Sequence, residues 1–287
     1  MSHDLATGTE PSGPEAALVR PADALAPAPA PFQADPSLGR SVLDLWPIPV
    51  AFAVFVVAWK IAAVVAGLAF ILPAPEVVAA RFVAAWADGT IEPHAWTTVV
   101  EMTLGFVVGS TGGLLAGYVI ARSRLVERLV SPYLVAAQAV PILAFAPLLA
   151  LWFGPGLLAK VVICALIVFF PVAIATMVGI RSVDRGLLEL AASLRATRRQ
   201  IATTIEIPAA LPSIMGGLRV GATLSVVGAI VGEWVGADKG LGVLVNLARG
   251  SLFDYPLLFA TLITIALLGI ACYLLVVLVE RRLVGLR

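Results

Sequence analysis

Three polar side chains could bind or guide a solute, because each lies within or at the end of a long apolar segment. They are Glu101, Gln138 and Glu233. A charged group in the hydrocarbon region of a membrane is costly, so it usually faces protein or a water-filled path. These residues are therefore candidates for the lining of a solute path, although Glu101 could instead reach the lipid headgroups at the membrane interface.

The sequence lacks the residue sets on which common enzymatic sites are built. It has no G-x4-G-K-[ST] phosphate loop, and no Ser/His/Asp triad or paired-carboxylate site is apparent. His3 and His94 are isolated, and Cys164 and Cys272 lie in apolar segments, so neither a metal site nor a disulfide is indicated. We expect no catalytic residue, metal or cofactor in this chain, and any ATP and Mg²⁺ would be bound by a partner.

The composition is that of a membrane protein. Hydrophobic residues make up 60% of the chain and charged residues 13%, and the mean hydropathy is +1.01. These values exclude an ordinary soluble domain, and the net charge of +1 indicates no attraction to nucleic acid. A helix needs about twenty apolar residues to cross a bilayer. Six segments qualify, which predicts an all-α bundle of about six transmembrane helices: 48–72, 97–121, 130–153, 157–180, 213–236 and 256–279.

Prolines and glycines add detail to these spans. Pro141 and Pro147 should kink or break the third span. Glycines four residues apart line the second and fifth spans, from Gly105 to Gly117 and from Gly217 to Gly236. Such stripes allow close helix packing, and they could also let helices slide past one another during transport.

The distribution of basic residues predicts the orientation in the membrane. Lys and Arg exceed Asp and Glu after the second span, in the segment 182–212 and at the C-terminus. These three regions lie on one side when six spans alternate, and this side is the cytoplasm by the positive-inside rule. Residues 1–45, rich in Pro and Ala, are expected to form a disordered cytoplasmic tail, and residues 46–287 the transmembrane domain.

The segment 182–212 is a charged insert between the fourth and fifth spans. Asp184 can cap a first helix, and Thr197 with Gln200 has the form of a capping box that begins a second one. The second helix should end before Pro208. The apolar side of the first helix consists of Leu187, Leu188, Leu190, Ala191 and Leu194. A helix-turn-helix that is apolar on one side and basic on the other suits docking against a partner.

This insert resembles the "EAA" loop of ABC-importer permeases, with the pattern E-A-A-x3-G-x9-I-x-L-P. The resemblance implies that the insert docks on an ATPase through Glu189, Ala191, Arg195, Ala196, Thr197, Arg198, Ile201 and Pro208. Leu190 replaces the usual Ala and Arg195 the usual Gly. An Arg at this turn means either that no positive φ is needed or that the strain is tolerated.

The Leu-Arg-Ala turn and the stretch from Gly232 to Gly242 are similar to the nitrate/taurine/sulfonate-type permeases, especially riboflavin and pyrimidine-precursor importers. The resemblance implies a type I ABC-importer permease fold in a bacterial inner membrane. It implies as partners a second permease copy, two ATPase subunits, an extracytoplasmic solute-binding protein and the lipid bilayer. The implied cargo is a thiamine-precursor pyrimidine or riboflavin, with a sulfonate, nitrate or an aromatic acid as alternatives.

Two other classes of function remain open from the sequence. An ion-coupled secondary transporter would need carboxylates or broken helices at the midplane of an inverted repeat. The sequence shows no such internal symmetry, and only Glu101 approaches the requirement. A membrane-bound assembly protein without transport activity would fit the insert but not the glycine-rich spans.

Overall fold

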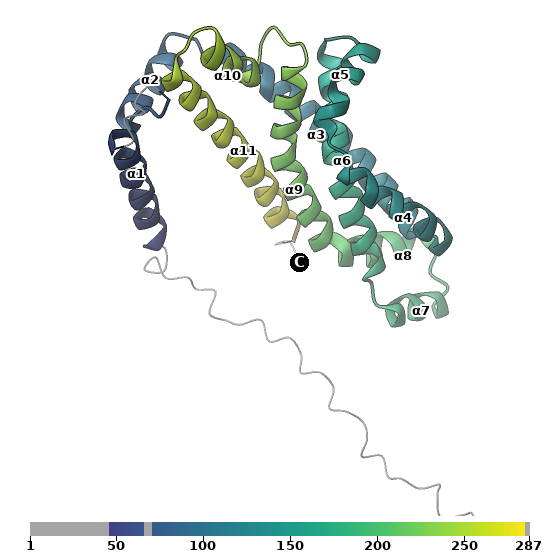
Figure 1. Ribbon diagram of the computed structural model, residues 1–287. Coiled ribbons are helices and arrows are strands. Elements are labelled where there is room, and N and C mark those ends of the chain that lie inside the picture. Colours follow the sequence, from purple (N-terminus) through teal and green to yellow (C-terminus); the bar gives the residue numbers. More distant parts are fainter. Residues whose placement is uncertain (1–45, 66–70, 285–287) are drawn as a thin grey trace, which may run out of the picture. The chain divides into compact units, whose positions relative to one another are not determined.

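The computed structural model describes residues 46–65 and 71–284, so the predicted tail 1–45 lies outside the described residues. The chain divides into two units, 1–55 and 56–287, and the second contains the helical bundle considered below. The regular elements of the described part are helices (Figure 1). They are α1 (Pro47–Val65), α2 (Pro75–Ala87), α3 (Glu92–Ala121), α4 (Arg124–Ala139), α5 (Ile142–Phe153), α6 (Leu157–Arg181), α7 (Arg185–Ser193), α8 (Arg198–Ile201), the π-helical turn η2 (Ala202–Glu206), α9 (Ile207–Trp234), α10 (Leu241–Gly250) and α11 (Tyr255–Val284).

The predicted all-α membrane bundle is confirmed. Five of the described helices or continuous helical segments are long and apolar enough to cross a membrane, and α4 with α5 forms a sixth candidate that is bent by 95°. The bend lies where a break was predicted. Val140 and Pro141 have extended backbone between the two helices, because Pro141 has no N–H to continue the ladder of α4.

Helix α6 packs between α3 and α9, and glycines make this close packing possible. A Cβ added to Gly109 of α3 would lie 2.5 Å from the backbone oxygen of Ala165 in α6. A Cβ added to Gly228 of α9 would lie 2.7 Å from the Cα of Cys164. The packing role predicted for the glycine stripes is therefore confirmed, and Cys164 is a buried apolar residue within this interface.

The tight contact predicts a clear difference between two glycine variants. Gly109→Ala should destabilise the protein by about 2 kcal/mol, because the new methyl group meets rigid backbone that cannot move aside alone. Gly216→Ala, in α9, meets no atom within 4 Å and should be neutral or stabilise the helix by up to about 1 kcal/mol. The midpoint of thermal unfolding in detergent, monitored by size-exclusion chromatography, distinguishes the two variants. Equal midpoints would contradict the packing described here.

A second core lies at the end of the bundle where α9 finishes and α11 begins. Buried residues of α2, α10 and α11 meet there, among them Ala85, Leu241, Leu244 and Leu257. Asp254 receives the Leu257 N–H at 2.9 Å, which caps α11, and it also pairs with Arg81 of α2 at 2.9 Å. The short helices α2 and α10 are thus fixed to the start of α11.

Candidate functional site

Helix α7 presents an apolar stripe that nothing in the described chain covers. The helix begins as predicted, with the Asp184 carboxylate accepting the Gly186 N–H at 2.7 Å. Leu187, Leu190 and Leu194 are 49%, 58% and 74% exposed, whereas Ala191 on the inner face is buried. Apolar side chains at this spacing on one exposed face are typical of a protein-interaction site.

The turn after α7 requires a positive φ, and Arg195 adopts it with φ 56°. The Ala196 N–H bonds to the oxygen of Ala191 and the Arg195 N–H to that of Ala192, both at 3.0 Å. This pair of bonds is a Schellman motif, in which the left-handed residue is usually glycine. The sequence left open whether this turn needs a positive φ. It does, and Arg195 adopts that conformation despite the strain.

This strain gives a local prediction. A left-handed conformation costs a non-glycine residue roughly 1–2 kcal/mol, and glycine loses part of that gain to its larger chain entropy. Arg195→Gly should slow hydrogen exchange at the amide of Ala196 by about fivefold, as read by mass spectrometry of the peptide that contains the turn. Ser193→Gly, at a helical position of α7, should speed exchange instead. Faster exchange in the Arg195 variant would show that the turn does not hold a positive φ.

The second helix of the insert begins where it was predicted to begin, but it does not end where it was predicted to end. Thr197 and Gln200 form the capping box, with the Thr197 N–H bonded to Gln200 Oε1 at 2.8 Å. The prediction that the helix ends before Pro208 is wrong. A π-helical turn, η2, joins α8 to α9, and the Ile207 N–H bonds five residues back to Ala202. The wider turn lets Pro208 occupy the first turn of α9 without breaking the helix.

An ion pair between a buried glutamate and an exposed arginine ties this π-helical turn to the end of α3. Glu206 of η2 is 5% exposed, and its Oε1 accepts a hydrogen bond from Arg122 Nη1 at 2.8 Å. Tyr118 donates to the same carboxylate at 3.4 Å, and the Arg122 guanidinium lies 5.3 Å from the centre of the Tyr118 ring. Glu206 therefore links the segment that follows α8 to the end of α3 as well as to α9.

The eight residues predicted to couple to an ATPase lie in one segment, from Glu189 to Pro208, and they differ in how much of each side chain is exposed. Glu189, Arg195, Thr197 and Arg198 are exposed, Ala196, Ile201 and Pro208 are half-buried, and Ala191 is buried. The exposed leucines of α7 were noted in the sequence as an apolar side but were not chosen as site residues. Contact of this set with an ATPase stays a prediction.

A cluster of polar side chains is buried where α3 and α6 begin and α9 ends. Lys160 Nζ of α6 lies 2.7 Å from Glu101 Oε1 of α3, and these residues are 8% and 1% exposed. Glu233 of α9, 1% exposed, accepts a hydrogen bond from Thr98 Oγ1 of α3. Glu101 therefore does not reach the headgroups, and both glutamates are enclosed by protein.

The same cluster holds the first turn of α10. The Gly242 N–H donates to Glu233 Oε2, and the Leu241 N–H donates to Thr98 Oγ1 at 2.9 Å. The free N–H groups at a helix N-terminus favour a negative partner, and the Glu233 carboxylate supplies one. Gly240 has φ 141° and lies against this carboxylate, where a Cβ would collide with it.

The predicted path residues thus separate into two places. Glu101 and Glu233 belong to the buried cluster, and Gln138 is exposed on α4 next to the break at Pro141. Contact of any of them with solute stays a prediction. Sequence reasoning missed Lys160 and Thr98. A single lysine inside the apolar segment 157–180 was the available signal for the first, and no pattern marks the second.

Residues 109–285 match the family model described as "Binding-protein-dependent transport system inner membrane component". The chain belongs to this family. It is 44% identical over 243 residues to the riboflavin transport system permease protein RibX of Chloroflexus aurantiacus, covering 83% of this chain and 90% of the relative. It is 35% identical over 219 residues to the formylaminopyrimidine transport permease protein ThiX of Halalkalibacterium halodurans, covering 76% and 87%.

The solved structures agree on the fold of this permease. An inward-facing form of the MetNI methionine ABC transporter gives a TM-score of 0.58 at 20% identity, covering 66% of this chain and 94% of that chain. At this identity the likeness shows the fold alone. The permease family and the type I importer fold predicted from the "EAA" loop are confirmed, and the protein is a transport subunit of an ABC importer.

Proposed function

We propose that two copies of this permease form the solute path of an importer with two ATPase subunits and an external solute-binding protein. The observation that carries this proposal is the exposed leucine stripe of α7, held by a capped and strained turn beside α8. A rigid element with an uncovered apolar face is suited to a groove in a partner. The basic residues around it support placing this end, and both termini, in the cytoplasm of an inner-membrane protein.

The continuous segment from α8 through η2 to α9 supports a mechanism for coupling. In this mechanism ATP binding closes the two ATPase subunits, and their grooves shift α7 and α8. The shift passes directly into α9 and, through Arg122 and Glu206, into α3. ATP binding thereby changes the populations of the inward-open and outward-open states of the permease. A ligand can do this only if it binds one of the two states more tightly than the other.

We infer that the cargo is a planar nitrogen heterocycle, riboflavin or a thiamine-precursor pyrimidine. Support comes from the names of the relatives RibX and ThiX and from the length over which the chains align. Sulfonates, nitrate and aromatic acids are the alternatives. The buried glutamates and the exposed Gln138 stay candidates for the path, and the glutamates would meet solute only if their cluster opened.

The cargo is tested on the binding protein that assembles with this permease. A thermal-shift screen against riboflavin, pyrimidines, sulfonates, nitrate and aromatic acids should show stabilisation by a flavin or pyrimidine at low micromolar concentration. Uptake of that compound into proteoliposomes should require the ATPase subunits and ATP. Stabilisation only by a sulfonate or an inorganic anion would overturn the cargo, and uptake driven by an ion gradient without ATPase would overturn the mechanism.

A further inference from the structure

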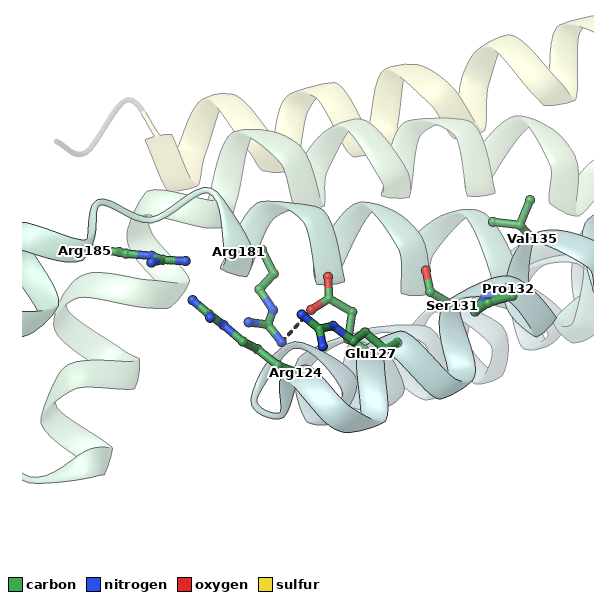
Figure 2. A pocket seen from close by; sticks show the side chains of 8 residues that line it. Arg124, Glu127, Ser131, Pro132, Val135, Arg181 and Arg185 are labelled. Carbon is green, nitrogen blue, oxygen red and sulfur yellow. Dashed lines mark ion pairs between the residues drawn. The ribbon is translucent and has the colours of Figure 1, made fainter.

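A basic cavity lies between α4, the end of α6 and the start of α7. It has a volume of about 810 Å³. Figure 2 shows Arg124, Arg181 and Arg185 from these three helices, with Arg181 beside Glu127, and Ser131, Pro132 and Val135 further along α4. The lining residues are Arg124, Glu127, Arg128, Ser131, Pro132, Val135, Arg181 and Arg185.

The arginines of the cavity are not neutralised by the described part of the chain. Glu127 is the one acidic lining residue, and it pairs with Arg181 at 2.6 Å. No acidic side chain of residues 46–65 or 71–284 lies within ion-pair distance of Arg124, Arg128 or Arg185. Arg122 differs, because it is matched by Glu206. The cavity therefore carries an excess of three positive charges.

One side of the Arg181 guanidinium has no acceptor among the described residues. Its Nε is buried and has no hydrogen-bond partner among the described residues, although Nη2 lies beside Glu127. A buried N–H without an acceptor is costly, so this guanidinium is suited to a further anionic oxygen. A phosphate diester provides such oxygens and matches the planar, multidentate geometry of arginine.

The position and surroundings of the cavity favour a lipid as the source of that phosphate. Arg181 is the last residue of the span formed by α6, and Arg124 follows the span of α3 by three residues. The arginines therefore lie at the level where the spans leave the hydrocarbon. Val135, which lines the cavity, is 60% exposed, and Leu125 and Leu129 elsewhere on α4 are 68% and 60% exposed. Acyl chains could cover these residues while the headgroup meets the arginines.

We propose that this cavity binds the headgroup of an anionic glycerophospholipid. Basic pockets between helices at the cytoplasmic surface are suited to such headgroups. The bound lipid would join α4, α6 and α7, and so brace the first coupling helix against the bundle. This site is separate from the exposed leucines of α7 and does not depend on the identity of the cargo.

The test measures lipid binding to the purified permease–ATPase complex in detergent by native mass spectrometry. Phosphatidylglycerol should bind to the wild-type complex in preference to phosphatidylcholine. Arg124→Gln with Arg128→Gln should weaken phosphatidylglycerol binding by about 30-fold, since each basic residue contributes about 1 kcal/mol. Arg124→Lys with Arg128→Lys keeps the charges and should retain most of the binding. Arg281→Gln with Arg282→Gln, on exposed positions of α11, removes the same charge elsewhere and should change the affinity by less than about twofold.

Three outcomes would overturn the proposal. The first is equal affinity of the wild-type and glutamine variants for phosphatidylglycerol. The second is displacement of the lipid by equimolar glycerol 3-phosphate, which would assign the cavity to a soluble anion. The third is loss of the ATPase subunits from the glutamine variant without any change in lipid affinity, which would assign the arginines to a protein partner.

Discussion

Lys160→Met should destabilise the permease by about 3–5 kcal/mol, because it leaves the Glu101 carboxylate buried without its cation. The pair is enclosed on both sides, and Glu101 Oε2 already lacks a hydrogen-bond partner among the described residues. The loss should appear as a lower midpoint of thermal unfolding in detergent. No comparable loss is expected for Lys239→Met, since Lys239 is exposed in the loop before α10.

A double-mutant cycle separates the ion pair from the general packing of this site. Lys160→Met with Glu101→Gln removes both charges and should recover most of the stability lost in the single variant, by about 2–3 kcal/mol. If the losses in the free energy of unfolding of the two single variants simply added in the double variant, the interaction between Lys160 and Glu101 would not contribute to stability. Packing alone would then explain why these residues are buried.

The cluster matters because it is one of two places where α3 and α9 are joined by a buried glutamate. Glu233, near the end of α9, accepts from Thr98 near the start of α3. Glu206, just before α9, accepts from Arg122 just after α3. With α6 packed between them through glycines, the three helices are fixed near both ends. A force applied at α7 and α8 should therefore move these helices as one body.

The sequence predicted the features that depend on neighbouring residues. Asp184 caps α7 through a bond to a residue two positions away, and Thr197 and Gln200 satisfy each other within one helical turn. The break before α5 likewise follows from one proline and its missing N–H. Such features hardly depend on the rest of the chain, so local patterns are enough to find them.

The features that were missed or mispredicted depend on distant packing. Lys160 and Glu101 are 59 positions apart, and Glu233 and Thr98 are 135 apart, so no local pattern pairs them. Pro208 was expected to end a helix, but η2 removes the need for the bond that proline cannot make. The ion pair between the buried Glu206 and the exposed Arg122 holds that turn in place, and it forms only when α3 and α9 have packed.

The largest functional effect is expected at the coupling segment. Glu189→Lys with Arg198→Glu reverses two exposed charges that flank the strained turn, without touching a buried residue. Like charges placed opposite each other across an interface cost several kcal/mol, so ATPase association should weaken by about 100-fold. ATP-driven uptake should fall with it, while the thermal midpoint of the permease alone stays near that of the wild type. The measurement is co-purification of the ATPase subunits together with uptake into proteoliposomes.

A matched control reverses two exposed charges in the loop between α9 and α10. Asp238→Lys with Lys239→Glu keeps the same net charge as the coupling variant and lies at the other end of α9. It should leave ATPase association unchanged, because that end is predicted to face away from the cytoplasm. Intact association and uptake in the Glu189/Arg198 variant would show that α7 and α8 are not the docking surface. The exposed leucines of α7 would then need another partner, since water alone does not stabilise an apolar stripe of this kind.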